Sequence, residues 1–162
     1  MPSGVMAQNI ALLIHSQKSK KGSTSSSSSS TSSPSMRFAC HHTSHLLLWE
    51  ENSYKELLNM DAVEISTRED VNENGIHIPP LRYEDVSNCF LKQKEYYDSN
   101  VKSKKLAENG LSTLIIELPH RELGGKLTPW KDVLDMGELC KKEDVKFHCD
   151  GARIFEASAG YG

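Results

Sequence analysis

The chain has 162 residues, a formal net charge of −3 at pH 7 and a sequence pI of about 6.2. This length suits one domain, since domains commonly hold about 100–150 residues. The slightly acidic balance argues against a general nucleic-acid-binding protein, for which a domain pI above about 9 is typical. The sequence holds no run of about 18 apolar residues, so no membrane-spanning helix is expected.

The start of the chain and its cysteines predict where the protein works. Met1 leads into Pro-Ser-Gly instead of a basic segment followed by a long apolar one, so no secretory signal is predicted. The four cysteines, at positions 40, 89, 140 and 149, form no Cys-x-x-Cys motif. We therefore expect a cytoplasmic protein with free thiols.

The first element is expected to be a helix. Residues 5–14 are mostly apolar and follow Ser3-Gly4, which can start a helix, so we expect a helix buried nearly all round. A helix N-terminus presents unpaired N–H groups that suit a phosphate, although an ordinary serine cap explains the same residues. No strand precedes this helix, so we expect the chain to begin within a domain.

Residues 16–36 are almost entirely Ser, Thr and Lys. Such a segment cannot bury enough apolar surface to offset its ordering entropy, so it is predicted to be a disordered insertion. The remaining residues, 1–15 and 37–162, are expected to form one partial domain.

Strands and helices alternate after the insertion. Strands are expected at residues 38–40, 61–66, 111–117 and 145–149, and helices at residues 44–54, 83–91 and 128–141. Ser44 is the expected cap of the first of these helices. The alternation predicts a parallel or mostly parallel α/β sheet with flanking helices, in which ligands bind outside the carboxyl ends of the strands.

A cluster of metal-ligand residue types raises the alternative of a zinc site. Cys40, His41, His42 and His45 stand close together in the sequence. Structural zinc usually needs four ligands at recognisable spacings, and the next cysteine, Cys89, falls in a predicted helix. We therefore predict no metal site.

The stretch on which the functional prediction depends is residues 148–155. Asp150 and Arg153 stand three residues apart, just past the end of a predicted strand. Taken alone, the pair is equally explained by a local ion pair at a turn. With His148 ahead of it, however, the stretch resembles the His-x-Asp-Gly-Ala-Arg signature of low-specificity threonine aldolases. These enzymes belong to the β-eliminating lyase group of pyridoxal-phosphate enzymes.

Three further segments resemble the same family, in the same order along the chain. Residues 2–6 resemble its phosphate-binding turn, and Ser44-His45 with Glu50 resembles its Ala-His…Glu segment. Residues 117–120, followed by Gly-Gly-Lys at 124–126, resemble its Glu-Asn-Thr-His…Gly-Gly-Lys segment. The resemblance implies a partial large domain of the aspartate-aminotransferase-like fold, with a mostly parallel sheet, and a site for pyridoxal 5'-phosphate.

The resemblance also implies roles for residues that would hold the cofactor. Asp150 would lie beside the pyridine nitrogen, and Arg153 would contact the phenolic oxygen or the substrate. Gly4 and the amide of Val5 would face the phosphate. Val5 departs from the family, which often has Thr there, so phosphate contact would depend on backbone groups.

Three residues are implied to act nearer the substrate. His45 would stack on the pyridine ring and is the candidate catalytic base for the substrate β-hydroxyl, since imidazole titrates near neutral pH. A capping or solvent-facing histidine is the alternative. Glu117 and His120 are expected to border the substrate pocket, although a loop histidine without a role explains His120 equally well.

The implied reaction cleaves threonine or a similar β-hydroxy-α-amino acid to glycine and an aldehyde, in a full-length form that is a homo-oligomer. The family's Schiff-base lysine is expected beyond Gly162, because the lysines at 126, 131, 141, 142 and 146 all precede Asp150. We therefore expect this chain alone to be inactive. A β-eliminating amino-acid lyase of the same fold and a non-catalytic truncated remnant are the alternatives.

Overall fold

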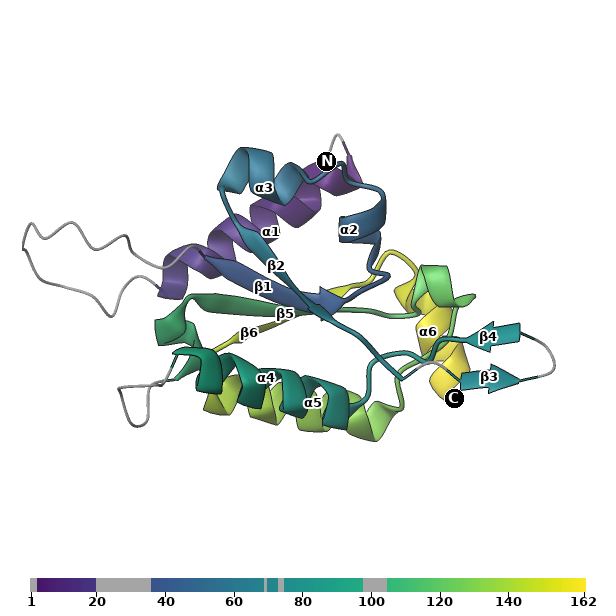
Figure 1. The fold of residues 1–162 in the computed structure, drawn as a ribbon. Helices are drawn as coiled ribbons and strands as arrows, with labels where there is room; N and C mark the ends of the chain where they lie inside the picture. The colour runs from purple at the N-terminus through teal and green to yellow at the C-terminus, as the bar shows by residue number, and fades with distance from the viewer. Residues whose placement is uncertain (1–2, 20–35, 69, 73–74, 98–104) are drawn as a thin grey trace, which may run out of the picture.

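A four-stranded parallel sheet forms the centre of the protein (Figure 1). The computed structural model describes residues 3–19, 36–68, 70–72, 75–97 and 105–162. The strand order is β2-β1-β5-β6, and each neighbouring pair runs parallel. The strands are β1 (Arg37–His41), β2 (Asp61–Ile65), β5 (Leu111–Glu117) and β6 (Lys146–Asp150). The predicted parallel α/β architecture is therefore confirmed.

Helices cover both faces of the sheet (Figure 1). One face carries α1 (Gly4–Ser19), α2 (His45–Leu48) and α3 (Ser53–Leu58), and the other carries α4 (Tyr83–Tyr97) and α5 (Trp130–Lys142). The shorter elements are β3 (Asp70–Asn72), β4 (Gly75–His77), the 3-10 helices η2 (Leu106–Asn109) and η3 (Arg121–Leu123), and α6 (Ile154–Tyr161). No helix among the described residues is long and apolar enough to cross a lipid bilayer.

The core has two layers because side chains of a strand alternate between the faces of the sheet. The layer under α1 and α3 contains Leu12, Phe38, Cys40, Tyr54 and Ile115. The layer under α4 and α5 contains Ala39, Val86, Phe90, Leu114, Ile116, Val133 and Met136. All seven residues of β5 are buried, including the polar Ser112, Thr113 and Glu117, which makes it a central strand of the core.

The first helix is longer and less buried than the sequence predicts. Helix α1 continues to Ser19, inside the predicted insertion at residues 16–36. Residues 20–35, which carry the rest of that prediction, lie outside the described residues. The expectation of a helix buried nearly all round is wrong, because α1 packs on the sheet through one side. Its other side exposes Met6, Ile10, Leu13 and Ile14.

Other element boundaries also differ from the prediction. The single helix expected at residues 44–54 is divided into α2 and α3, because Glu51 and Asn52 adopt left-handed φ values of 48° and 58°. Helix α4 extends past Leu91 to Tyr97. Strand β6 lies one residue later than the predicted 145–149. Asp150 is therefore the last residue of the strand and does not follow its end.

Candidate active site

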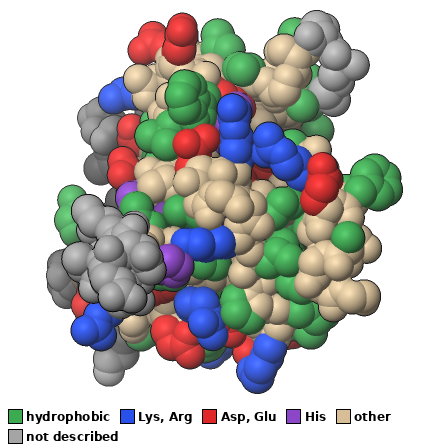
Figure 2. Space-filling model, turned by 90° about the vertical axis from the view of Figure 1, so that its right-hand side faces the viewer, with side chains coloured by type: hydrophobic (Ala, Val, Ile, Leu, Met, Phe, Trp, Pro, Cys, Tyr) green, Lys and Arg blue, Asp and Glu red, His purple; other side chains and the backbone are tan. Residues whose placement is uncertain are grey.

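A cavity of about 420 Å³ lies at the carboxyl ends of β5 and β6, between α1 and the segments that follow β1, β5 and β6. Figure 2 looks onto this end of the molecule, where acidic and basic side chains lie next to one another in the upper half. The cavity is lined by Gly4, Ala7, Gln8, His45, Glu50, Glu117, Pro119, Arg121, Asp150, Ala152 and Arg153. Its size is typical of sites for small molecules, which measure roughly 300–1,000 Å³.

Most of the residues selected from the sequence meet in this one cavity. Its lining includes five of them: Gly4, His45, Glu117, Asp150 and Arg153. They come from segments far apart in the chain, which the parallel sheet brings to the same edge. Val5 and His120 are not among the lining residues.

The N-terminus of α1 faces the cavity at Gly4. The Ser3 hydroxyl accepts a hydrogen bond from the Met6 amide at 3.2 Å, which caps the helix start. A Cβ placed on Gly4 would meet no atom within 4 Å, so this position leaves open space next to the first helical amides. Amides at a helix N-terminus together with such space suit an anion.

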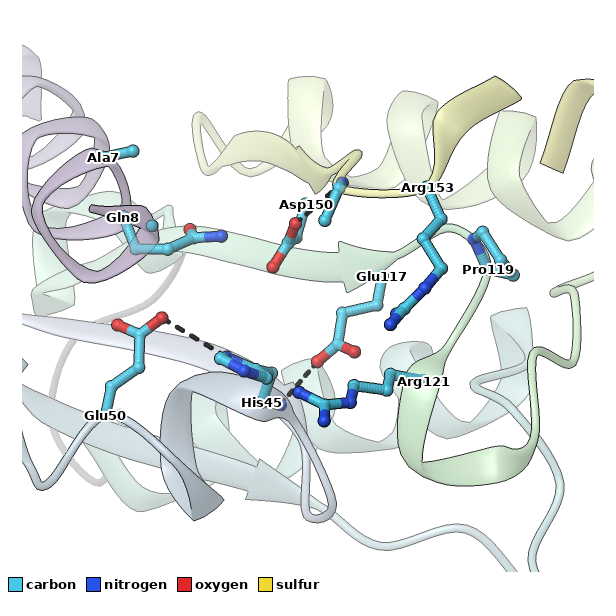
Figure 3. Close-up of a pocket in the computed structure, with 11 residues that line it drawn as sticks. Ala7, Gln8, His45, Glu50, Glu117, Pro119, Arg121, Asp150 and Arg153 are labelled. Carbon is cyan, nitrogen blue, oxygen red and sulfur yellow. Dashed lines mark hydrogen bonds and ion pairs between the residues drawn. The ribbon is translucent and has the colours of Figure 1, made fainter. Parts of the chain in front are cut away.

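His45 is held from two directions (Figure 3). Its Nδ1 lies 3.4 Å from Oε1 of the buried Glu50. Its backbone N–H donates to Oε1 of Glu117 at 2.6 Å, and the Ser44 hydroxyl donates to the same oxygen at 2.9 Å. Ser44 is the N-cap residue of α2, as predicted, but its side chain makes no capping hydrogen bond. Its hydroxyl is a donor, and the Glu117 carboxylate caps α2 in its place.

Two polar side chains at the cavity wall each have an oxygen atom that accepts no hydrogen bond in the described part of the chain. Within the described residues, Oε2 of Glu50 and Oε1 of Gln8 are buried without a hydrogen-bond partner. Burial raises the pKa of the Glu50 carboxyl above its usual range, and the neighbouring His45 partly opposes this shift. The arrangement leaves acceptors available beside His45.

Asp150 and Arg153 do not pair with each other. The Asp150 carboxylate accepts a hydrogen bond from the Ala152 amide at 3.1 Å and points into the cavity (Figure 3). Among the described residues, the Arg153 guanidinium forms no ion pair or hydrogen bond. The local ion pair that would explain both residues without a ligand is thus not formed.

Arg121 is a cavity residue that the sequence did not reveal. Its Nε lies 3.6 Å from Oε1 of Glu122, and its guanidinium carbon lies 5.7 Å from the centroid of the Trp49 ring. The Trp49 indole in turn donates to Glu122 at 2.9 Å. Gln8 was also missed, although its position one helical turn after Gly4 was an available signal. The signal for Arg121 was its place in the loop after β5.

Helix α6 connects the two arginine-bearing segments. It begins directly after Arg153, and at its other end the Tyr161 hydroxyl donates to the Thr128 carbonyl at 2.6 Å. A Cβ on Gly160 would lie 2.5 Å from Cδ1 of Leu127, so a larger residue would require the Leu127 side chain to move. Both contacts fix α6 against the segment that follows Arg121.

His120 lies behind the cavity. It is buried, and its Nε2 lies 3.1 Å from the Thr43 hydroxyl. With Glu117 it borders a separate space of only about 10 Å³. Within the described residues, no three His, Cys, Asp or Glu side chains are arranged to hold a metal ion, so the zinc alternative has no ligand set there.

A parallel α/β sheet with a charged cavity at its strand ends, beside a helix N-terminus, is typical of proteins that bind small anionic molecules or cofactors. The chain belongs to the β-eliminating lyase family, whose sequence pattern matches residues 1–162. The family inferred from residues 148–155 is therefore confirmed.

Known proteins similar to this chain include threonine aldolase candidates. A candidate low-specificity L-threonine aldolase 2 of Arabidopsis thaliana is 25% identical over 164 residues, which cover 100% of this chain and 37% of that protein. The structure of a candidate L-allo-threonine aldolase of Listeria monocytogenes EGD-E is 26% identical with a TM-score of 0.66, and the match covers 99% of this chain and 33% of that one.

A second solved structure is similar in fold. It is a candidate aromatic amino acid β-eliminating lyase/threonine aldolase of Exiguobacterium sp. 255-15, 22% identical with a TM-score of 0.65. The match covers 99% of this chain and 33% of that chain. These likenesses confirm the predicted fold class. The chain spans about a third of the length of the relatives it matches.

Proposed function

We propose that the protein is a pyridoxal-phosphate-dependent carbon–carbon lyase that cleaves threonine or a similar β-hydroxy-α-amino acid to glycine and an aldehyde. The observation that carries this proposal is the meeting of His45, Asp150, Arg153 and the α1 N-terminus at one cavity. No Phe, Tyr or Trp side chain lines the cavity in the described part of the chain, and most of its lining residues are polar or charged, which favours a polar substrate over an aromatic one.

The residues present fit the cofactor. The open space at Gly4 suits a phosphate next to helical amides, including that of Val5. The carboxylate of Asp150, which accepts from the Ala152 amide and forms no ion pair among the described residues, suits a protonated pyridine nitrogen. When bound, pyridoxal phosphate would supply an electron-accepting ring that stabilises charge on the α-carbon of an amino acid.

The protein's own side chains would orient the substrate and move its proton. Arg153 would bind the substrate carboxylate through two parallel hydrogen bonds. His45 would accept the proton of the β-hydroxyl at a ring nitrogen. Glu50 would hold the imidazole of His45 through its Nδ1 atom, and Glu117 would fix the backbone of His45 through its N–H group. Glu117 would border the substrate end of the site, and His120 would lie behind it, beside the small space that Glu117 also borders.

Replacing Asp150 with Asn tests the cofactor site. We expect Asp150→Asn to weaken the binding of pyridoxal phosphate by about 10- to 100-fold, because a charge-assisted hydrogen bond contributes about 1.5–3 kcal/mol. Binding would be followed through the absorption spectrum of the cofactor, and circular dichroism would verify the fold.

Asp144→Asn is the matched control, because it removes the same charge just before the other end of β6, where Asp144 contacts Lys146 at 3.3 Å. Its affinity should equal that of the unchanged chain. Equal affinities in all three proteins, or no saturable binding at all, would overturn the proposal.

We further propose that the 162-residue chain alone has no aldolase activity. The described cavity-lining residues include no lysine, and an amine nucleophile is the covalent handle for a carbonyl cofactor. Incubation with pyridoxal phosphate and L-threonine should give glycine and acetaldehyde at the rate of a protein-free blank. Sustained product formation above that blank would show this expectation to be wrong.

A further inference from the structure

We propose that Arg121 gives the cavity a second anion-binding position, which selects a β-hydroxy-α-amino acid whose side chain carries a carboxylate. This inference deepens the proposed function and rests on it. The class is represented by 3-hydroxyaspartate. Cleavage of its Cα–Cβ bond would yield glyoxylate from the β-carbon half, with the hydroxyl proton passing to a base. The α-carbon would take up one proton to give glycine, so no oxidant is required.

The carboxylates at the cavity contact groups other than arginine. Glu117 accepts from Ser44 and His45, and Glu50 faces His45 at 3.4 Å. Asp150 accepts from the Ala152 amide. None of the three forms an ion pair with an arginine among the described residues. Two guanidinium groups therefore face the cavity without an acidic partner from its wall.

Arg121 is held in place at one edge only. Glu122 engages its Nε, and the Trp49 ring lies against its guanidinium. The two terminal nitrogens have no partner in the described part of the chain, so they remain available to a ligand. A planar guanidinium offers a fork of donors that matches a carboxylate.

The two arginines lie on the opposite side of the cavity from α1. Figure 3 shows Ala7 and Gln8 on one side and Arg121 and Arg153 on the other, with His45 and Asp150 between them. A phosphate at the α1 N-terminus would leave both arginines at the substrate end. The α-carboxylate of an amino acid satisfies one of them. The side chain of threonine ends in a methyl group, which cannot accept a hydrogen bond from the second arginine. A side-chain carboxylate can accept from that arginine.

The Trp49 indole reports on Arg121 directly, because the two side chains are in contact. We would titrate the 162-residue chain, with and without saturating pyridoxal phosphate, with L-threo-3-hydroxyaspartate and with L-threonine. The shift of the Trp49 indole N–H resonance gives each dissociation constant, and Trp130→Phe assigns the signal.

Hydroxyaspartate is expected to bind about 3- to 10-fold more tightly than threonine, a modest preference because the Arg121 side chain is 48% exposed. Arg121→Gln should remove this preference and leave the threonine affinity within about twofold. Lys141→Gln, which removes a positive charge in the last turn of α5, should leave both affinities unchanged.

Equal affinities for the two amino acids, or a preference that survives Arg121→Gln, would overturn the inference. Loss of pyridoxal phosphate binding is a separate readout and concerns the proposed function alone. If the cofactor binds in a manner that depends on Asp150 but hydroxyaspartate has no advantage, only the inference about Arg121 fails. If the cofactor does not bind, the cofactor-free titration still decides whether Arg121 prefers the dicarboxylate.

Discussion

Replacing Glu117 with Ala is expected to lower the free energy of unfolding by about 2–4 kcal/mol. The buried carboxylate accepts hydrogen bonds from the Ser44 hydroxyl and the His45 amide, at 2.9 and 2.6 Å. Alanine would leave both donors unpaired next to the core, and each unpaired buried donor costs about 1–3 kcal/mol. Urea denaturation measures the change.

Two further variants make this expectation specific. Both donors bond the same oxygen, so the carbonyl oxygen of Glu117→Gln can accept both hydrogen bonds, and only the contribution of the charge, less than half of the alanine effect, should be lost. Glu108→Ala, at an exposed position of η2, should change the stability by less than about 0.5 kcal/mol. If Glu117→Ala and Glu108→Ala have the same effect, Glu117 does not cap α2. The His45 amide resonance, displaced by its short hydrogen bond, should move in Glu117→Ala even if the protein stays folded.

The second large effect is a loss of stability in acid that originates at His41. Burial, followed by the charges of His120 and His42, lowers the pKa of His41 from 6.5 to about 3. In the unfolded chain His41 binds a proton below pH 6.5, whereas in the folded protein it stays neutral. Stability is therefore lost as the pH falls from 6.5 towards 3. One pKa unit corresponds to 1.36 kcal/mol, so the loss between pH 7 and 5 is about 2 kcal/mol.

The hydrogen bonds of His41 explain why its neutral form is preferred. The Thr67 hydroxyl donates to the Pro79 carbonyl at 3.0 Å, so it can only accept from Nε2 of His41, which lies 3.1 Å away. Nδ1 accepts from the Thr43 amide at 3.1 Å and therefore carries no proton. A second proton on the ring would break that bond inside the core.

Two measurements test this assignment. His41→Gln should flatten the dependence of the unfolding free energy on pH between 7 and 5, whereas His77→Gln, at an exposed position, should preserve it. Because the first variant could weaken the core, NMR titration of the unchanged chain provides an independent check. A His41 ring that titrates near pH 6.5 would contradict the expectation.

The sequence predicted those parts of the fold that depend on burial alone. Strand β5 has the expected bounds because seven consecutive buried residues leave few alternatives. The division between α2 and α3 was not predictable, since it depends on left-handed conformations at Glu51 and Asn52, and neither is glycine. The outer face of α1 was misjudged because an apolar residue in a sequence does not reveal whether anything covers it.

The same distinction applies to the site. Residues at strand ends, such as Glu117 and Asp150, could be placed because parallel strands end at one edge of a sheet. The segment of Arg121 follows β5 and so reaches the same edge, but its side chain could not be placed in the cavity, because neighbours such as Trp49, distant in the sequence, position it. The capping of α2 by Glu117 was hidden for the same reason, since it joins segments that only the sheet brings together.

The attachment of α6 at both ends has a consequence for the energetics of recognition. Arg153 precedes one end of the helix, and Tyr161 and Gly160 hold the other end against Thr128 and Leu127. The backbone spacing between Arg153 and the loop of Arg121 is thus set during folding, before any ligand arrives. The conformational entropy of this backbone is lost on folding and is not lost again when a ligand binds. The site therefore favours rigid or short ligands whose charges already have the matching separation.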